Sequence, residues 1–266
     1  MDRERLAGLI VDNTAWLARN LFFYEETGST NEDIKQLAKE GAADGTLVVA
    51  DMQTAGRGRR GRDWFSPKGE SIYMSLLLRP KCMPNQASAL TLVMALAVLE
   101  AIEEIVPGMC GIKWPNDIVI NGKKVCGILT EMGLKHNEID YVVIGVGINV
   151  NQSSFAEEIA TTATSIALEC GTKMERAELI GRVLYYFEQE YARFEKTYDL
   201  TGLVDRYNQY LLNKERQVRV LDPKGEYEGI ALGINSQGEL LVKCQSGEMI
   251  EVYAGEVSVR GIYGYV

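Results

Sequence analysis

The stretch "GIKWPNDIVINGKKVCGILTEMG", residues 111 to 133, decides the fold class of this chain. Strand-like runs lie on either side of Asn121-Gly122, a dipeptide that strongly favours a tight β-hairpin turn. A further strand-like run, "IDYVVIGVGINVN" (139 to 151), follows after a turn that contains His136. Together these runs predict an antiparallel meander.

Helices and other strands surround the meander. Helical spacing covers residues 4 to 20, and "STNEDIKQLAKEG" (29 to 41) combines a capping start with acidic first-turn residues and a terminal glycine. An apolar run predicts a long helix from 87 to 106, which ends at Pro107-Gly108. Further helices are predicted at 174–198 and 201–212, and further strands at "LFFYEE" (21 to 26), "GTLVVADM" (45 to 52) and "SIYMSLLLRP" (71 to 80).

The pattern changes after Asn213. From Gln217 onward the chain consists of short alternating runs separated by "DPKG", "NSQG" and "QSGE". This pattern is typical of a small β-barrel. We therefore predict a mixed α/β domain over residues 1–213 and a barrel over 214–266.

The loop "QTAGRGRRGRDWFSP" (53 to 67) is basic, whereas the whole chain is acidic, with 28 Lys and Arg against 37 Asp and Glu and a net charge of −9. A protein that coats nucleic acid needs the opposite sign, because neutralised phosphates supply most of the non-specific affinity. Backbone N–H groups and guanidinium forks in such a loop suit phosphate and carboxylate groups. The loop therefore favours a small anion, although a solvated charged loop has the same composition.

Cysteine usage and hydropathy indicate a cytoplasmic protein. The five cysteines form no C-x-x-C pair, and the single histidine, His136, lies in a predicted turn. The N-terminus lacks the apolar segment of a signal peptide, and the run at 87–102 is too short to span a bilayer. We expect no membrane and no metal role for His136 or the cysteines.

Polar residues at strand ends favour an anion site over a merely solvated loop. The segments "KWPNDI" (113 to 118) and "GVGINVN" (145 to 151) each end or begin a predicted strand, where polar groups commonly line a site. Such residues also occur as simple turn formers. The four that matter here are Lys113, Asn116, Asp117 and Asn149.

Five motifs occur in an order that resembles the biotin protein ligases, and they extend over nearly the whole chain. The resemblance implies an α+β catalytic domain similar to class II synthetases, with an SH3-like barrel at the C-terminus. It also implies ATP-dependent activation of biotin as biotinyl-5'-AMP, followed by transfer to a lysine of a biotin carboxyl carrier protein. The motifs are "GSTN" (28 to 31), "QTAGRGRRGRDWFSP" (53 to 67), "KWPNDIVINGKKVCGILTEM" (113 to 132), "IGVGINVN" (144 to 151) and "TSIALECG" (164 to 171).

The resemblance assigns a biotin site. Biotin has an apolar bicycle, a ureido head and a carboxylate, so its pocket needs hydrogen-bonding groups at one end and cations at the other. Thr30 and Asn31 are equally well explained as helix caps, and Lys123 is expected in solvent. The matching residues are Ser29, Thr30, Asn31 and Gln53 on the ureido side, Arg57, Gly58 and Arg59 in the loop, Lys124 at the carboxylate and α-phosphate, and Gly127 where the backbone approaches the ligand.

The resemblance also assigns a nucleotide site. ATP and a carboxylate repel each other, so the enzyme must neutralise charge and align an oxygen with the α-phosphorus. We expect Mg²⁺ to bind the triphosphate with few protein ligands. Asp117 has three open roles: metal binding, ribose binding, or accepting the proton of the acceptor amine. The predicted residues are Trp64, Asn116 and Asn149 at the nucleotide, and Lys124, Arg59, Lys113 and Asp117 as the catalytic set.

Some relatives carry an N-terminal winged DNA-binding domain. Only 27 residues precede "GSTN" here, so we expect a ligase that does not bind nucleic acid. A homodimer with sheets side by side is a family expectation. Two rival functions remain: a lipoate or octanoate attachment enzyme of the same superfamily, and a non-catalytic regulator that binds an effector.

Overall fold

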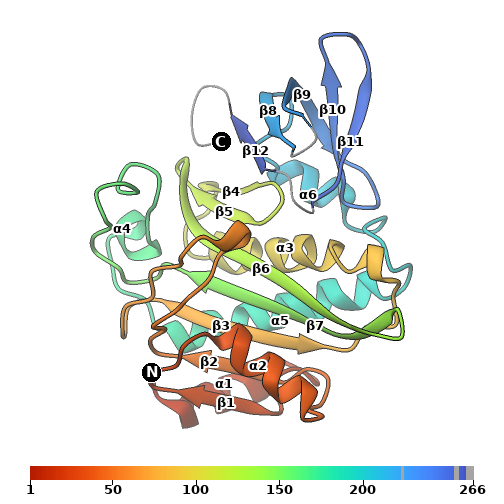
Figure 1. The fold of residues 1–266 in the computed structure, drawn as a ribbon. Coiled ribbons are helices and arrows are strands. Elements are labelled where there is room, and N and C mark those ends of the chain that lie inside the picture. The colour runs from red at the N-terminus through yellow and green to blue at the C-terminus, as the bar shows by residue number, and fades with distance from the viewer. Residues whose placement is uncertain (223–224, 255–257, 262–266) are drawn as a thin grey trace.

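The computed structural model describes residues 1–222, 225–254 and 258–261. Most of the chain forms a large mixed sheet with helices on both faces, and the C-terminal part forms a second, smaller antiparallel sheet (Figure 1). The predicted meander is confirmed, because β4 to β7 pair in sequence order with antiparallel register. Asn121 and Gly122 both have positive φ, 50° and 77°, as a tight hairpin turn requires.

The large sheet has the strand order β1-β2-β3-β7-β6-β5-β4. Only β1 and β2 run parallel; every other neighbouring pair is antiparallel. The order places β3 beside β7, two strands that are far apart in the sequence. The strands are β1 (Leu21–Tyr24), β2 (Leu47–Ala50), β3 (Ile72–Leu78), β4 (Cys110–Lys113), β5 (Asp117–Ile120), β6 (Lys123–Lys135) and β7 (Glu138–Ile148).

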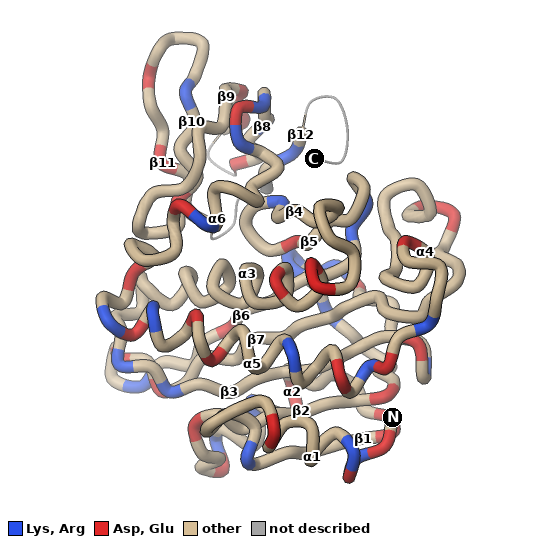
Figure 2. Tube along the Cα trace, turned by 180° about the vertical axis from the view of Figure 1, so that it is seen from behind, with Lys and Arg blue, Asp and Glu red and all other residues tan. Residues whose placement is uncertain are grey.

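Alternate residues of each strand bury opposite faces of the sheet. On β7, Val142 and Ile144 belong to the core formed with α3 and α5, whereas Tyr141 and Val143 pack with α2. Of the helical segments that the structure describes, only Pro84–Glu103, which includes α3, is long and apolar enough to span a membrane, and most of this segment is buried. The α3 trace carries few charges compared with α1 and α2 (Figure 2). The helices are α1 (Arg3–Asn13), α2 (Thr30–Lys39), α3 (Ala89–Glu103), α4 (Ile166–Cys170), α5 (Arg176–Phe194) and α6 (Val204–Tyr210).

The predicted helix over 4–20 is wrong beyond Asn13, where α1 ends. The Glu188 carboxylate on α5 accepts the backbone N–H groups of residues 15, 16 and 17, at 2.8, 2.9 and 3.2 Å. These donors are therefore satisfied by a side chain that is remote in sequence and not by a further helical turn. The end of α1 is therefore set by a tertiary contact with α5 and not by the local sequence.

Where a small barrel was predicted, five strands after α6 form an antiparallel sheet in the order β11-β10-β9-β8-β12. Among the described residues no pairing joins β11 to β12, so these strands do not close into a barrel. Trp114 links this sheet to the large one, because its Nε1 donates to the Gly238 carbonyl at 3.0 Å and its backbone N–H donates to Asn213 Oδ1 at 2.9 Å. The strands are β8 (Gln217–Leu221), β9 (Tyr227–Ile234), β10 (Leu240–Cys244), β11 (Met249–Val252) and β12 (Ser258–Gly261).

Candidate active site

Glycines form the floor of a pocket on the α2 face of the large sheet. Two rows of residues cross β3, β7 and β6: Tyr73 with Gly147 and Gly127, and Ser75 with Gly145 and Leu129. A Cβ atom at Gly147 would lie 2.5 Å from the Trp64 ring, and one at Gly127 would lie 2.9 Å from it. The floor is therefore bare backbone, which permits a flat group to lie directly on it.

Polar groups close this pocket where α2 begins. The Thr30 backbone N–H donates to Gln53 Oε1 at 2.9 Å, and the Gln53 amide donates to Ser66 Oγ at 3.0 Å. Ser75 Oγ lies 2.8 Å from Thr30 Oγ1 and 2.6 Å from Asn31 Oδ1. Thr30, Asn31 and Ser75 are all buried. The closed end thus offers fixed donors and acceptors away from solvent.

The arginine loop lies over the opposite end of the pocket. The Trp64 ring covers the glycine floor with Lys124 Nζ 5.3 Å from its centroid, and its buried Nε1 has no hydrogen-bond partner. A Cβ at Gly56 would lie 2.5 Å from the Trp64 carbonyl, so the loop requires a glycine there. With the indole in this position, only about 50 Å³ of the pocket is open. A ligand of biotin's size therefore requires Trp64 to move.

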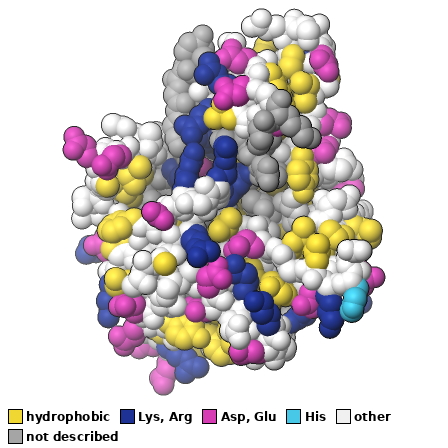
Figure 3. Space-filling model, in the orientation of Figure 1, with side chains coloured by type: hydrophobic (Ala, Val, Ile, Leu, Met, Phe, Trp, Pro, Cys, Tyr) yellow, Lys and Arg dark blue, Asp and Glu magenta, His cyan; other side chains and the backbone are white. Residues whose placement is uncertain are grey.

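Charged side chains stand where the pocket meets a second cavity. Lys124 Nζ lies 2.6 Å from Asp117 Oδ1. Arg59 donates to Asn116 Oδ1 at 2.9 Å and to the Ala254 carbonyl at 2.7 Å. The loop is thereby tied both to the "KWPND" segment and to the C-terminal sheet. In Figure 3, Lys and Arg side chains gather in the hollow below that sheet.

The second cavity has a volume of about 480 Å³ and is open to solvent. Lys113 lies in its wall and is 8% exposed, and burial lowers its pKa to about 8. Asn149 Nδ2 donates to the Thr164 carbonyl at 3.0 Å, which fixes the segment that leads into α4. Phe155 and Ile159 also line this cavity. Sequence reasoning missed both, because isolated apolar residues in a polar loop give no local signal.

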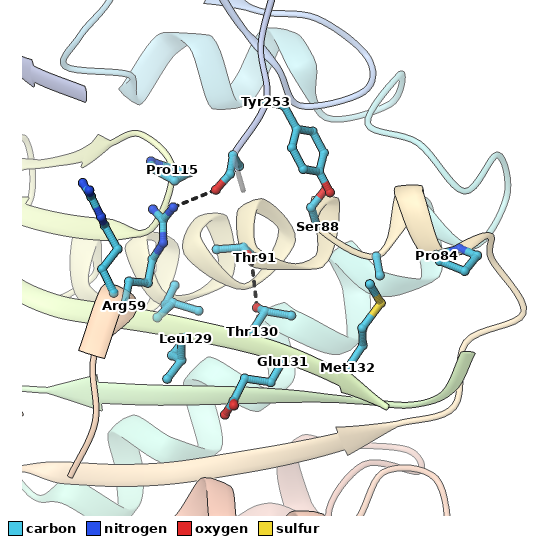
Figure 4. Close-up of a pocket in the computed structure, with 14 residues that line it drawn as sticks. Arg59, Pro84, Ser88, Thr91, Pro115, Leu129, Thr130, Glu131, Met132 and Tyr253 are labelled. Carbon is cyan, nitrogen blue, oxygen red and sulfur yellow. Dashed lines mark hydrogen bonds between the residues drawn. The ribbon is translucent and has the colours of Figure 1, made fainter. Parts of the chain in front are cut away.

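A third cavity is a groove of about 500 Å³ that begins at Arg59 (Figure 4). It follows β6, which pairs with β5 only as far as Gly127; beyond that point no described strand covers its outer edge. The start of α3 forms the opposite wall, where Thr91 donates to Thr130 at 2.8 Å. Tyr253 from the C-terminal part overhangs the groove.

Comparison with known proteins identifies the family. The chain matches the Biotin/lipoate A/B protein ligase family over residues 24–149 and the Biotin protein ligase C terminal domain over residues 215–260. It is 39% identical to the Bifunctional ligase/repressor BirA of Bacillus subtilis, over 92% of this chain and 76% of that protein. It is 36% identical to the biotin–[acetyl-CoA-carboxylase] ligase of Mycobacterium tuberculosis, over 96% and 92%. The chain belongs to the biotin protein ligase family.

Solved structures of biotin protein ligases share this fold. The ligase from Aquifex aeolicus in complex with biotin and ATP superposes with a TM-score of 0.79 and 34% sequence identity, covering 91% of this chain and 99% of that one. The predicted fold class, a mixed sheet with helices and a C-terminal β domain, is therefore confirmed. The domain boundary between 213 and 214 remains a prediction.

The predicted site residues of this biotin protein ligase come together from separate motifs. The glycine-floored pocket and the second cavity share Gly58, Arg59, Trp64, Asn116 and Lys124 in their walls. The two cavities therefore meet at the charged groups. The pocket is further lined by Ser29, Thr30, Asn31, Gln53, Arg57 and Gly127, and the second cavity by Lys113, Asp117 and Asn149.

Proposed function

We propose that this protein is the ligase that activates biotin as biotinyl-5'-AMP and transfers it to a lysine of a biotin carboxyl carrier protein. The observation that carries the proposal is the position of the cations between a closed pocket with a polar end and an open cavity. Arg59 and Lys124 line both spaces, and Lys113 lines the second. This arrangement suits two anionic substrates that must react with each other.

We propose that biotin lies on the glycine floor, with its ureido head toward Thr30 and Gln53. Its carboxylate then reaches Lys124, and ATP occupies the second cavity. A carboxylate oxygen attacks the α-phosphorus, the bond to the bridging oxygen breaks, and pyrophosphate leaves. Lys124 stabilises the negative charge that builds up on the transferred phosphate, while Asp117 orients Lys124 through their 2.6 Å ion pair.

Mg²⁺ enters with ATP in this proposal. Within residues 1–222, 225–254 and 258–261, no group of three or more Asp, Glu, His or Cys side chains could hold a metal ion. We therefore propose that the triphosphate provides most of the ligands, as is usual for Mg²⁺. Asp117 is the acidic side chain that pairs with Lys124, at 2.6 Å.

The groove supports a route for the carrier. It leads along the outer edge of β6 to Arg59, so a carrier lysine can approach the adenylate from this side. The lysine amine attacks the acyl carbon and AMP leaves, which requires the neutral amine; only about one part in a thousand of a free lysine is neutral near pH 7. The same edge of β6 supports a side-by-side homodimer, because no described strand pairs with it beyond Ile128, whose backbone groups are bonded to Asn116. We also propose a cytoplasmic location, where the carboxylases are made.

Biotin-dependent exchange of labelled pyrophosphate into ATP tests the proposed function. We expect exchange with biotin and none with lipoate, because the pocket ends in fixed hydrogen-bonding groups that suit a ureido head. Exchange with lipoate alone would assign the protein to the lipoate attachment enzymes. Tight binding of biotin without exchange would favour a non-catalytic regulator.

The low pKa of Lys113 predicts a pH dependence. A lysine with a pKa of about 8 loses its charge as the pH rises through that value, so attraction to the triphosphate is present below pH 8 and is lost above it. We expect kcat/KM for ATP to fall about tenfold between pH 7 and pH 9.5. In Lys113→Arg, which stays charged, this fall should be absent. An identical profile in both proteins would assign the titration to another group.

A further inference from the structure

A carboxylate from β6 takes part in the polar network at the closed end of the pocket. Asn31 Nδ2 donates to Glu131 Oε2 at 2.7 Å, and Ser75 lies 2.6 Å from Asn31 Oδ1. Lys35 holds the other oxygen of Glu131 at 3.0 Å. Glu131 is separated from Asn31 by 100 positions.

The Glu131 carboxylate fixes the orientation of the Asn31 amide. An ionised carboxylate only accepts hydrogen bonds, so it must face the NH₂ group of Asn31 and would repel its oxygen. Ser75 alone does not select an orientation, because a hydroxyl can either donate or accept. The Asn31 amide is buried and lies against Gly145, where an added Cβ atom would collide with Oδ1. Glu131 is therefore the group that selects the orientation of the Asn31 amide.

The orientation of Asn31 determines the neighbouring hydroxyl groups. With Asn31 Oδ1 facing it, Ser75 donates its one proton to Asn31. Ser75 can then only accept from Thr30, which lies 2.8 Å away and also lies 3.1 Å from Gln53 Oε1. The Thr30 hydroxyl therefore donates its proton either to Ser75 Oγ or to Gln53 Oε1. In both cases Thr30 Oγ1 offers only lone pairs to the pocket. An oxygen of that kind suits an N–H donor of the ligand.

We propose that Glu131 is a positioning residue for biotin. By fixing the Asn31 amide, it sets the hydrogen-bond direction of the closed end so that Thr30 accepts a ureido N–H. This inference rests on the proposed function. It concerns the affinity for biotin and leaves the chemistry at Lys124 untouched.

Steady-state kinetics of Glu131→Ala test the inference. We expect the KM for biotin to rise about tenfold or more, because a charge-assisted hydrogen bond is lost and the amide can invert. The KM for ATP and kcat should change less than about twofold. Glu131→Gln keeps a carbonyl acceptor for Asn31 and should recover most of the affinity. Lys35→Met is the matched control, because it removes the charge that pairs with Glu131 at 3.0 Å but keeps the bond from Asn31 to Glu131.

Three results would overturn the inference. One is an unchanged KM for biotin in Glu131→Ala. Another is an equal rise in Lys35→Met, which would point to the charge on Lys35. The third is a parallel rise in both KM values with a lower melting temperature, which would indicate a structural role. If the parent protein neither binds biotin in calorimetry nor exchanges pyrophosphate, the proposed function fails, and this inference fails with it.

Discussion

Replacing Lys124 by Met should reduce formation of biotinyl-5'-AMP about 30- to 150-fold. Lys124 stands at the junction of the two cavities, 2.6 Å from Asp117 and beside the Trp64 ring. The variant loses a charge-assisted contact to the reacting groups, a cost of roughly 2 to 3 kcal/mol. Met keeps most of the length and apolar stem of lysine, so packing against Trp64 changes little. Single-turnover adenylate formation is the measurement.

Lys123→Met is the matched control for this prediction. Lys123 is the preceding residue, it is exposed, and it does not line either cavity. Its variant should therefore form adenylate at the parent rate. Unchanged adenylate formation in Lys124→Met would show that another lysine carries the role, with Lys113 next in line. Thermal melting of both variants separates a loss of chemistry from a loss of folding.

Arg59→Gly should release biotinyl-5'-AMP at least about tenfold faster than the parent enzyme. The guanidinium donates to Asn116 and to the Ala254 carbonyl, so it anchors the loop at two points. The variant loses both bonds, each with a charged donor, and adds backbone freedom to a loop already rich in glycine. The open loop admits water and lets the mixed anhydride escape. Stopped-flow dissociation and labelling of an unrelated lysine-rich protein are the two measurements.

Arg60→Gly provides the control in the same loop. Arg60 is exposed and has a φ of 60°, a left-handed conformation that glycine adopts without strain. Its replacement should leave dissociation and bystander labelling close to the parent values. If Arg59→Gly shows neither faster release nor more labelling, the loop does not act as a lid, and its arginines form a solvated charged surface.

The hairpin and the strand pattern were predictable because their signals are local. Asn121-Gly122 accepts the positive φ values of a tight turn at little cost, and the alternation of residues on β7 reflects burial on two faces. The motifs also predicted which residues would gather, from Thr30 to Lys124, because their order matched a family. The end of α1 was not predictable, since the Glu188 carboxylate that satisfies residues 15 to 17 is more than 170 positions away.

Only the tertiary structure revealed how the site is held. The strand order β3-β7-β6 brings Ser75, Gly145 and Leu129 into one row. The next row on the same face, in which Glu131 is opposite Val143, places Glu131 against Asn31, a contact that depends on the register of these strands. The hydrogen bond from Arg59 to Ala254 could not be predicted from the sequence for another reason. Its acceptor is a backbone carbonyl, which every residue possesses, so the side chain at position 254 gives no signal. Local sequence patterns determine where the turns lie and which face of a strand is buried. Long-range strand pairing determines which polar groups meet, because each such contact joins chain segments that no short pattern connects.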